Sequence, residues 1–336
     1  KELIENEGFK TIVINTGIMG EPSFTPDYSA NDVALKGGMS RQELIDKKDP
    51  GLGVSVMGEG ARKLVKELYD NGEISGCAAL GGGQGSFMAC TAMADLPIGF
   101  PKVLASTISF VAHDATMKDI KDGYVADTVV DVCGLNSILM RSIENAAGAI
   151  CGMARLYKPI ANLGKKRIAI TMFGVTTKCV EEVMASLGDE YEIQIYHSTG
   201  VGGAYMEQLI RQGAIDAVMD LTMGEISQTI THGSCAGIPT RLEGAGDMGL
   251  PQVVSFGGAE TINTTPEIMD KLKETPGRMF HAHNPTLILS RMTKEESVET
   301  ARLMAEKLNR AKGPVTVLIP LKGVSAYDKE GMFFYD

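Results

Sequence analysis

Residues 79–89 read ALGGGQGSFMA, an apolar run that passes through a cluster of glycines into a second apolar stretch. Glycine allows positive φ and close backbone approach, so this pattern predicts a buried strand that turns sharply into a helix. Two interpretations fit the turn. Its backbone N–H groups can hold a phosphate, or its glycines only permit tight packing. The sequence motif does not decide between these two interpretations. Ser86 stands where GxGxxG requires its last glycine, and the lysine of the GxxxxGK[ST] phosphate loop is missing.

Outward from this stretch, β-branched runs alternate with longer amphipathic segments, which predicts an α/β protein with parallel sheets. The strands predicted in the first half are residues 11–16, 76–80, 102–106 and 128–132, and those in the second half are 167–171, 192–196, 214–219, 252–255 and 315–319. The predicted helices are 58–71, 87–94, 136–157, 177–187, 205–212 and 294–309.

The chain is expected to form two domains. Residues 158–164 (KPIANLG) contain Pro and Gly and make the best boundary, which gives a first domain of residues 1–157 and a second of residues 165–336. The long helix over 136–157 ends the first domain and bridges to the second. The opening KELIENEGFK leads directly towards a strand, and we expect that an earlier first strand of this domain is missing.

Composition excludes several classes of protein. The net charge of -10, the absence of Trp and the lack of basic clusters argue against a nucleic-acid partner. No segment reaches the roughly 20 apolar residues of a membrane span, and no signal peptide opens the chain, so a cytoplasmic protein without a membrane partner is expected. The cysteines are scattered singly and are expected to be reduced.

In open α/β sheets, ligands bind in the loops that follow the carboxyl ends of strands. Three Gly- and Ser/Thr-rich turns occupy such positions, and together they predict a cleft of N–H and hydroxyl donors for a nucleotide or small anionic metabolite. For each turn alone, a purely structural role remains open. The candidate binding residues are Gly81, Gly82, Gly83, Gln84, Gly85, Ser86, Ser106, Thr107, Gly174, Thr176, Thr177, Thr199, Gly200, Gly202 and Gly203.

Few polar residues suggest catalysis. His197 lies beside a glycine turn at a strand end and is a candidate ligand contact or general acid/base, with a structural histidine as the alternative. Asp220 closes another strand, where it could orient a ligand or a magnesium-bound water, or cap a helix. His281 and His283 share one face of a strand, but no further ligand residues stand beside them, so no metal site is predicted.

Ordered blocks along nearly the whole chain carry a family resemblance. They include residues 16–22 (TGIMGEP), 80–85 (LGGGQG), 96–102 (LPIGFPK), 131–136 (DVCGLN), 172–177 (MFGVTT), 197–200 (HSTG), 220–222 (DLT), 249–255 (GLPQVVS), 283–285 (HNP) and 321–326 (LKGVSA). In these blocks the chain resembles the Tm-one-like ATP-binding domain family, formerly an uncharacterised family, which is related to the inhibitory domain of a plant virus-resistance protein. The family's opening strand and its GTLDTKG turn are absent, and residues 109–127 depart from its pattern.

The resemblance implies two Rossmann-like subdomains, each a mostly parallel sheet flanked by helices, with a ligand cleft between them. It also implies ATP as the ligand, possible magnesium, and a homodimer. The expected function is a nucleotide- or phosphometabolite-binding protein within a small-molecule catabolic enzyme system, with His197, Asp220, Arg241 and His283 facing the substrate. The alternative is a non-catalytic, nucleotide-dependent module that regulates or inhibits a protein partner.

Overall fold

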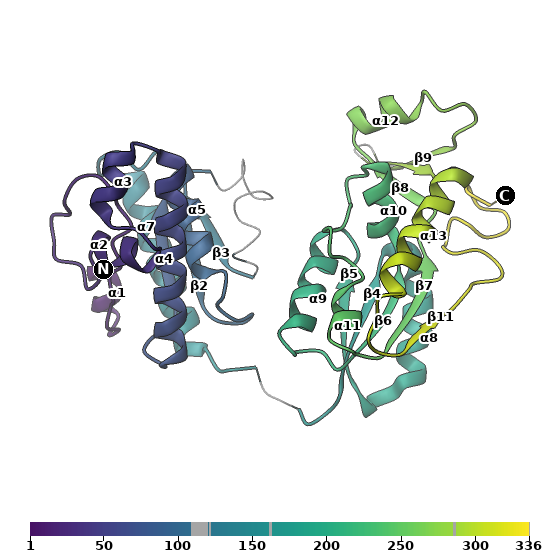
Figure 1. Cartoon of the computed structure of the whole chain (residues 1–336), viewed down its shortest axis with the longest axis horizontal. Helices are drawn as coiled ribbons and strands as arrows, with labels where there is room; N and C mark the ends of the chain where they lie inside the picture. Colours follow the sequence, from purple (N-terminus) through teal and green to yellow (C-terminus); the bar gives the residue numbers. More distant parts are fainter. Residues whose placement is uncertain (109–119, 121, 161–162, 285–286, 336) are drawn as a thin grey trace. The chain divides into compact units, whose positions relative to one another are not determined.

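The computed structural model describes residues 1–108, 120, 122–160, 163–284 and 287–335. The chain divides into two compact units, Lys1–Ala161 and Asn162–Asp336 (Figure 1). Each unit has its own parallel sheet with helices packed against it, which confirms the predicted α/β class. In the part of the chain that the structure describes, no helix is both long and apolar enough to cross a membrane.

The first unit contains a three-stranded parallel sheet of order β1-β2-β3. Gly81 pairs with Ser106, and Ser106 pairs with Asp127, so the three strands end at the same level. The strands are β1 (Cys77–Gly81), β2 (Lys102–Ser106) and β3 (Tyr124–Asp127), and the helices are α1 (Glu2–Asn6), α2 (Ala30–Lys36), α3 (Arg41–Lys47), α4 (Pro50–Asp70), α5 (Gly83–Met93) and α7 (Ser137–Leu156).

The core of the first unit forms where α4 packs against α2 and α5 (Figure 1). Asp49 caps α4 by accepting from the Leu52 N–H, and Pro50 occupies the first helical position. A Cβ on Gly60 would lie 1.9 Å from the Val33 carbonyl oxygen, so glycine is what lets α4 approach α2. β2 is buried at every residue, as the central strand of the sheet.

The second unit contains a five-stranded parallel sheet of order β11-β7-β6-β4-β5. Met172 pairs with His197, and Thr222 pairs with Gly257, so the carboxyl ends of β4 and β5, and those of β6 and β7, lie side by side. The strands are β4 (Arg167–Met172), β5 (Glu192–His197), β6 (Ala217–Thr222), β7 (Gln252–Gly257) and β11 (Val315–Val317). The helices are α8 (Thr177–Leu187), α9 (Val201–Arg211), α10 (Gly224–Thr231), α11 (Gly244–Asp247) and α13 (Lys294–Leu308), with short 3-10 turns at Gly174–Thr176 and Gly188–Glu190.

A small antiparallel sheet, absent from the sequence prediction, extends the second unit. Its order is β8-β10-β9, from β8 (Thr261–Thr264), β10 (Leu287–Arg291) and β9 (Phe280–Asn284), with α12 (Pro266–Leu272) between β8 and β9. The sequence placed His281 and His283 on one strand, which is β9. β8 is buried throughout and β9 is mostly exposed, so neither strand has the alternation of buried and exposed positions that is typical of half-buried strands.

Two predicted strands are wrong. Residues 11–16 make only an isolated bridge, from Ile14 to Tyr28. Residues 128–132 lie after β3, where Val129 has a φ of 64° and the Val130 N–H donates to the Thr128 carbonyl, so the chain turns there. A β-branched run gave the right composition for a strand, but the turn overrides it. The segment 109–127 departs from the family pattern, and most of it, residues 109–119 and 121, lies outside the described residues. Pro285, in the 283–285 block, also lies outside them.

Candidate functional site

The α5 turn (residues 81–86) joins β1 to α5 in the first unit. Gly82 is the N-cap of α5, which has no side-chain cap and no acidic residue in its first turn. A Cβ on Gly81 would lie 2.7 Å from the Gly85 carbonyl carbon, whereas a Cβ on Gly83 would meet no atom of the described residues within 4 Å. Gly81 is therefore needed for close packing, and Gly83 faces open space. The first N–H groups of α5 and the positive end of its dipole lie at this turn.

Two of the predicted hydroxyl contacts point inward instead. The hydroxyl oxygens of Ser86 and Ser106 lie 2.7 Å apart, and both residues are fully buried. The Ser106 hydroxyl also accepts from the Ile108 N–H. This pair joins the first turn of α5 to the end of β2. Thr107 is half-buried, and its hydroxyl lies 3.4 Å from the position that a Cβ on Gly82 would take.

The α9 turn (residues 199–203) holds a carboxylate of the chain itself. Glu225, at the start of α10, is fully buried and accepts from the N–H groups of Gly200 and Gly203 at 2.6 and 3.1 Å. A Cβ on Gly202 would lie 2.0 Å from the His197 carbonyl oxygen, so close packing requires glycine there too. This helix N-terminus therefore binds an anion, as its sequence suggests, but the anion is a side chain.

Arg241 holds that carboxylate in place. Its Nε donates to Glu225 Oε2 at 2.5 Å, and its two Nη atoms donate to the carboxylate of Asp220 at 2.5 and 2.7 Å. Glu207 Oε1 lies 3.7 Å from Arg241 Nη1. Burial alone would lower the pKa of Arg241, but the charges of Asp220 and Glu225 outweigh it and raise the pKa. Burial raises the pKa of Glu207, although Arg241 opposes this.

Asp220 and Arg241 were both expected to face a substrate. The structure brings them together, but Asp220 is only 1% exposed, Arg241 is 0% exposed, and each is engaged with the other. Their geometry is that of a bidentate, charge-assisted pair inside the unit. Through Glu225, this pair sets the conformation of the α9 turn.

The turn after β4 belongs to the same buried polar network. The Thr176 and Thr222 hydroxyls lie 2.8 Å apart, and the Thr171 hydroxyl donates to Asp220 Oδ1 at 2.8 Å. Thr177 donates to the Phe173 carbonyl at 3.3 Å. Gly174 is exposed and borders open space, because a Cβ added to it would meet no atom within 4 Å. Most hydroxyls at this edge of the second sheet therefore bond to the protein.

The three histidines singled out in the sequence, His197, His281 and His283, lie at two separate places. His197 is exposed at the end of β5, and its ring stacks on Phe173 with 5.4 Å between centroids. His283 Nδ1 lies 2.9 Å from the Tyr327 hydroxyl, and the His281 ring stacks on Phe333 at 3.6 Å. Within the described ranges, no group of three or more His, Cys, Asp or Glu residues is arranged to hold a metal ion.

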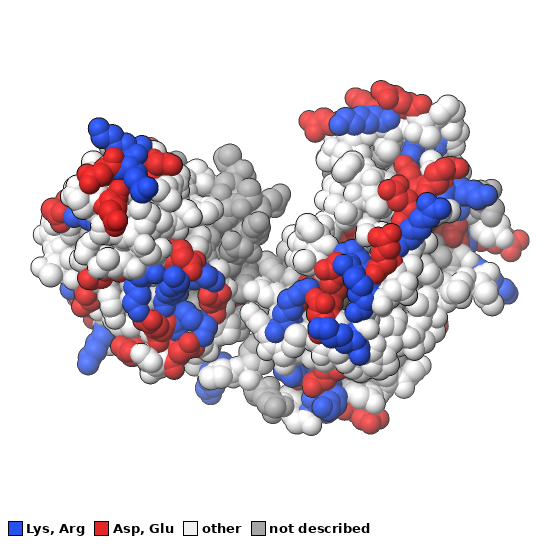
Figure 2. Space-filling view, in the orientation of Figure 1, with Lys and Arg blue, Asp and Glu red and all other residues white. Residues whose placement is uncertain are grey.

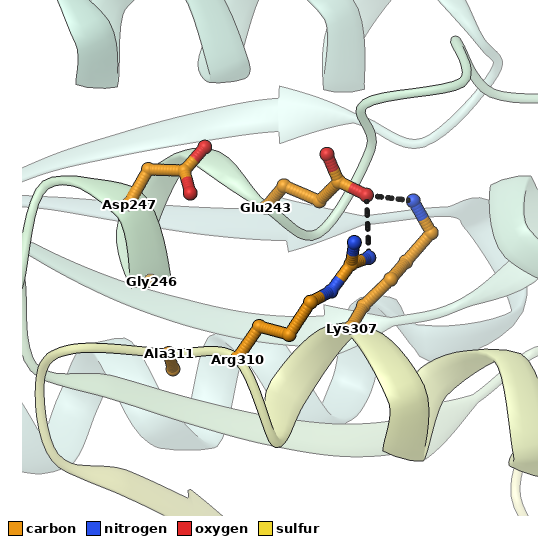
Figure 3. Close-up of a pocket in the computed structure, with 6 residues that line it drawn as sticks. All are labelled: Glu243, Gly246, Asp247, Lys307, Arg310 and Ala311. Atoms are coloured by element: carbon orange, nitrogen blue, oxygen red, sulfur yellow. Dashed lines mark hydrogen bonds and ion pairs between the residues drawn. The ribbon is translucent and has the colours of Figure 1, made fainter.

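A small pocket of about 60 Å³ is lined by none of these turn residues; its lining is Glu243, Gly246, Asp247, Lys307, Arg310 and Ala311 (Figure 3). Lys307 and Arg310 both donate to Glu243 Oε1, at 2.7 and 3.0 Å, and Asp247 lies beside them. The hydrogen bond from Lys307 lowers the pKa of Glu243. The pocket has room for only a few waters, and its basic groups are already paired, so it is not a nucleotide site. On the face drawn in Figure 2, acidic and basic side chains are interspersed.

Comparison with known proteins identifies the family. Residues 1–159 match the N-terminal domain of the Uncharacterised protein family UPF0261, and residues 165–336 match its C-terminal domain. The chain belongs to this family. A UPF0261 protein of Clostridium tetani is 42% identical over 336 residues, which cover 100% of this chain and 83% of the relative. A UPF0261 protein of Mesorhizobium japonicum is 34% identical over 315 residues, covering 92% of this chain and 77% of the relative.

A plant protein is also similar. The ToMV resistance protein Tm-1(GCR237) of Solanum lycopersicum is 36% identical over 293 residues, covering 85% of this chain and 38% of that protein. The family resemblance drawn from the sequence blocks is therefore confirmed.

Sequence reasoning missed the acidic residues that organise this UPF0261 chain. Glu225 and Glu207 follow apolar positions on helices and give no signal of their own. Glu260 is 8% exposed and lies two residues after Gly257–Gly258, close to a strand end, a position that could have drawn attention to it. What makes these residues notable is burial, which the sequence does not display.

Proposed function

We propose that this UPF0261 protein binds ATP or another phosphate-bearing metabolite at the α5 turn of its first unit. One observation carries the proposal: α5 begins at Gly83 beside open space, with neither a capping side chain nor an acidic residue in its first turn. Exposed N–H groups at a helix N-terminus favour phosphate and carboxylate groups.

The α9 turn supports this choice by contrast. There a similar glycine-rich turn has its N–H groups engaged by Glu225. A phosphate at α9 would have to displace a buried carboxylate that Arg241 also holds. The α5 turn has no such internal anion among the described residues and is the better candidate.

The second part of the proposal concerns catalysis. His197 and His283 keep their candidate roles as acid/base or ligand contacts because both are exposed. Asp220 and Arg241 act in this proposal as positioning residues for the α9 turn.

A non-catalytic binding module is the second candidate. The buried ionic groups at the carboxyl edge of the second sheet pair with one another, which leaves few of them for chemistry. The similarity to a tomato protein named for resistance to a virus also favours a role in binding a protein partner. Product formation from ATP separates an enzyme from a binding module.

The first test is a thermal-shift series with ATP, ADP, phosphoenolpyruvate and sugar acids, each with and without magnesium. A ligand at 100 times its dissociation constant stabilises the native state by about 2.7 kcal/mol. For a unit of this size, that raises the midpoint by roughly 5–10 °C. A shift with phosphate-bearing ligands supports the proposal, and a shift only with sugar acids would redirect it to a carboxylate site.

Two glycine variants locate the site. Gly83→Val places methyl groups in the open space at the α5 turn and is expected to abolish the ligand-induced shift. Gly148→Val, in the exposed part of α7, is the matched control because a Cβ there also meets no atom within 4 Å. If Gly83→Val retains the ATP shift of the wild type, the α5 turn is only a turn.

A further inference from the structure

The C-terminal strap (residues 323–334) crosses the carboxyl edge of the second sheet. The Ala326 N–H donates to the Val175 carbonyl, in the turn after β4, at 2.9 Å. The Gly258 N–H, in the turn after β7, donates to the Val324 carbonyl at 3.0 Å. Since β6 lies between β7 and β4, the strap spans the end of β6, which is where α/β sheets bind ligands.

The strap is folded and anchored. A Cβ on Gly323, which has a φ of 97°, would lie 1.6 Å from the Asp328 carbonyl oxygen, so this tight turn requires glycine. Asp328 accepts from the Val324 N–H at 3.1 Å and from Arg291 of β10 at 3.4 Å. Phe334 is fully buried, and its N–H donates to the Tyr327 carbonyl at 2.9 Å.

One buried carboxyl group links the strap to the sheet. Glu260 Oε1 accepts hydrogen bonds from the hydroxyls of Ser325, on the strap, and Thr261. Glu260 Oε2 is buried and has no hydrogen-bond partner within the described residues. A charged oxygen in that position would be costly, whereas a protonated carboxyl group avoids most of the penalty.

We propose that the strap is a proton-dependent cover for the carboxyl edge of the second sheet, latched in place by the protonated carboxyl group of Glu260. Loss of that proton to solvent leaves a buried charge beside Asp328, and the strap is released. Release exposes the turns after β4 and β7. Burial raises the pKa of Glu260, with Asp328 adding to the effect and Ser325 opposing it.

The direction of the pH dependence follows from the raised pKa of Glu260 in the docked state. Because the docked state holds the proton more tightly than the released state, docking weakens as pH rises through the raised pKa of Glu260. The other charged groups near the strap do not give this direction. Arg291 is paired with Asp328, Arg278 is paired with Glu296, and His283 bonds to the Tyr327 hydroxyl.

Hydrogen exchange of the intact chain tests the proposal. Protection of residues 323–334, corrected for the intrinsic pH dependence of exchange, should fall as pH rises, by about tenfold for each unit by which docking raises the pKa. Glu260→Gln, which is neutral and nearly isosteric, should keep the strap protected at every pH. Glu267→Gln, on exposed α12, is the matched control and should behave as the wild type.

Three outcomes would overturn the proposal. If protection of the strap in the wild type does not change with pH, no proton-dependent latch exists, whatever the variants show. A pH dependence that persists in Glu260→Gln assigns the proton elsewhere. Protection that falls on acidification instead would contradict the direction proposed for Glu260. If Glu260→Gln fails to fold, Ser325→Ala replaces it, and the expected result is a strap of low protection at all pH values.

Discussion

Arg241→Met gives the sharpest test of how the second unit is held together. The substitution removes a fully buried guanidinium that contacts Asp220 and Glu225 and lies 3.7 Å from Glu207. The methionine fills much of the space but leaves these carboxylates without their counter-charge. Removing one partner of a buried ion pair typically costs about 3–5 kcal/mol.

For a unit of this size, each kcal/mol lowers the midpoint by roughly 2–4 °C, so a fall of about 6–20 °C is expected. Calorimetry or urea denaturation at pH 7 measures it, and the transition affected should be that of the second unit. Arg310→Met is the matched control because Arg310 is 67% exposed and makes a single ion pair with Glu243. Exposed pairs contribute about 0–1 kcal/mol.

The pH dependence separates lost charge from lost packing. Burial already raises the pKa of Glu207, and loss of Arg241 removes the charge that opposes this rise, so the folded variant gains protons more readily than the wild type. The stability gap between the two should therefore narrow as pH falls towards the ordinary carboxyl range, about pH 4. A variant within 1 kcal/mol of the wild type at pH 7, or a gap that does not change with pH, would refute this account of the network.

Three further predictions concern stability. Gly81→Ala should lower the free energy of unfolding by about 1–3 kcal/mol, because its Cβ meets backbone atoms of Gly85 and Ser86, while Gly83→Ala should not; urea denaturation compares them. Ser106→Ala should lower the free energy of unfolding by about 1–3 kcal/mol, because it leaves the buried Ser86 hydroxyl with a weaker partner. If the double variant Ser86→Ala/Ser106→Ala is as stable as Ser106→Ala alone, the two hydroxyls are energetically coupled. Thr293→Ala removes the N-cap of α13 and should cost about 0.5–2 kcal/mol, seen as a lower denaturation midpoint, with Ser297→Ala as a control inside the helix.

Much of the fold could be predicted because local patterns determine it. The runs at residues 102–106 and 167–171 are continuous and apolar enough to become buried strands, and the structure has β2 and β4 there. The helices α7, α8 and α13 also lie close to their predicted bounds. The prediction failed at residues 128–132, where a turn held by backbone hydrogen bonds replaced a strand of suitable composition.

The candidate site was predicted less completely. Gly200 and Gly203 lie at a helix start, as their sequence position predicted, but the sequence did not reveal that their N–H groups bond to the carboxylate of Glu225. The residues of the Arg241 network are separated by 16–21 positions or more along the chain, and no spacing rule connects them. Two domains with a cleft between them, ATP, magnesium and a dimer stay predictions.

The sequence by itself determined that this chain forms parallel α/β units with glycine turns at strand ends, because strand and helix propensities, glycine freedom and capping are local properties. Only the tertiary structure decided which turn is open and which is filled. That difference depends on a carboxylate brought from another helix and on an arginine that offsets its burial. Charge placement of this kind is set by the packing of distant segments. The α5 and α9 turns are therefore similar in sequence, but only the N–H groups of the α9 turn are occupied by a carboxylate of the described residues.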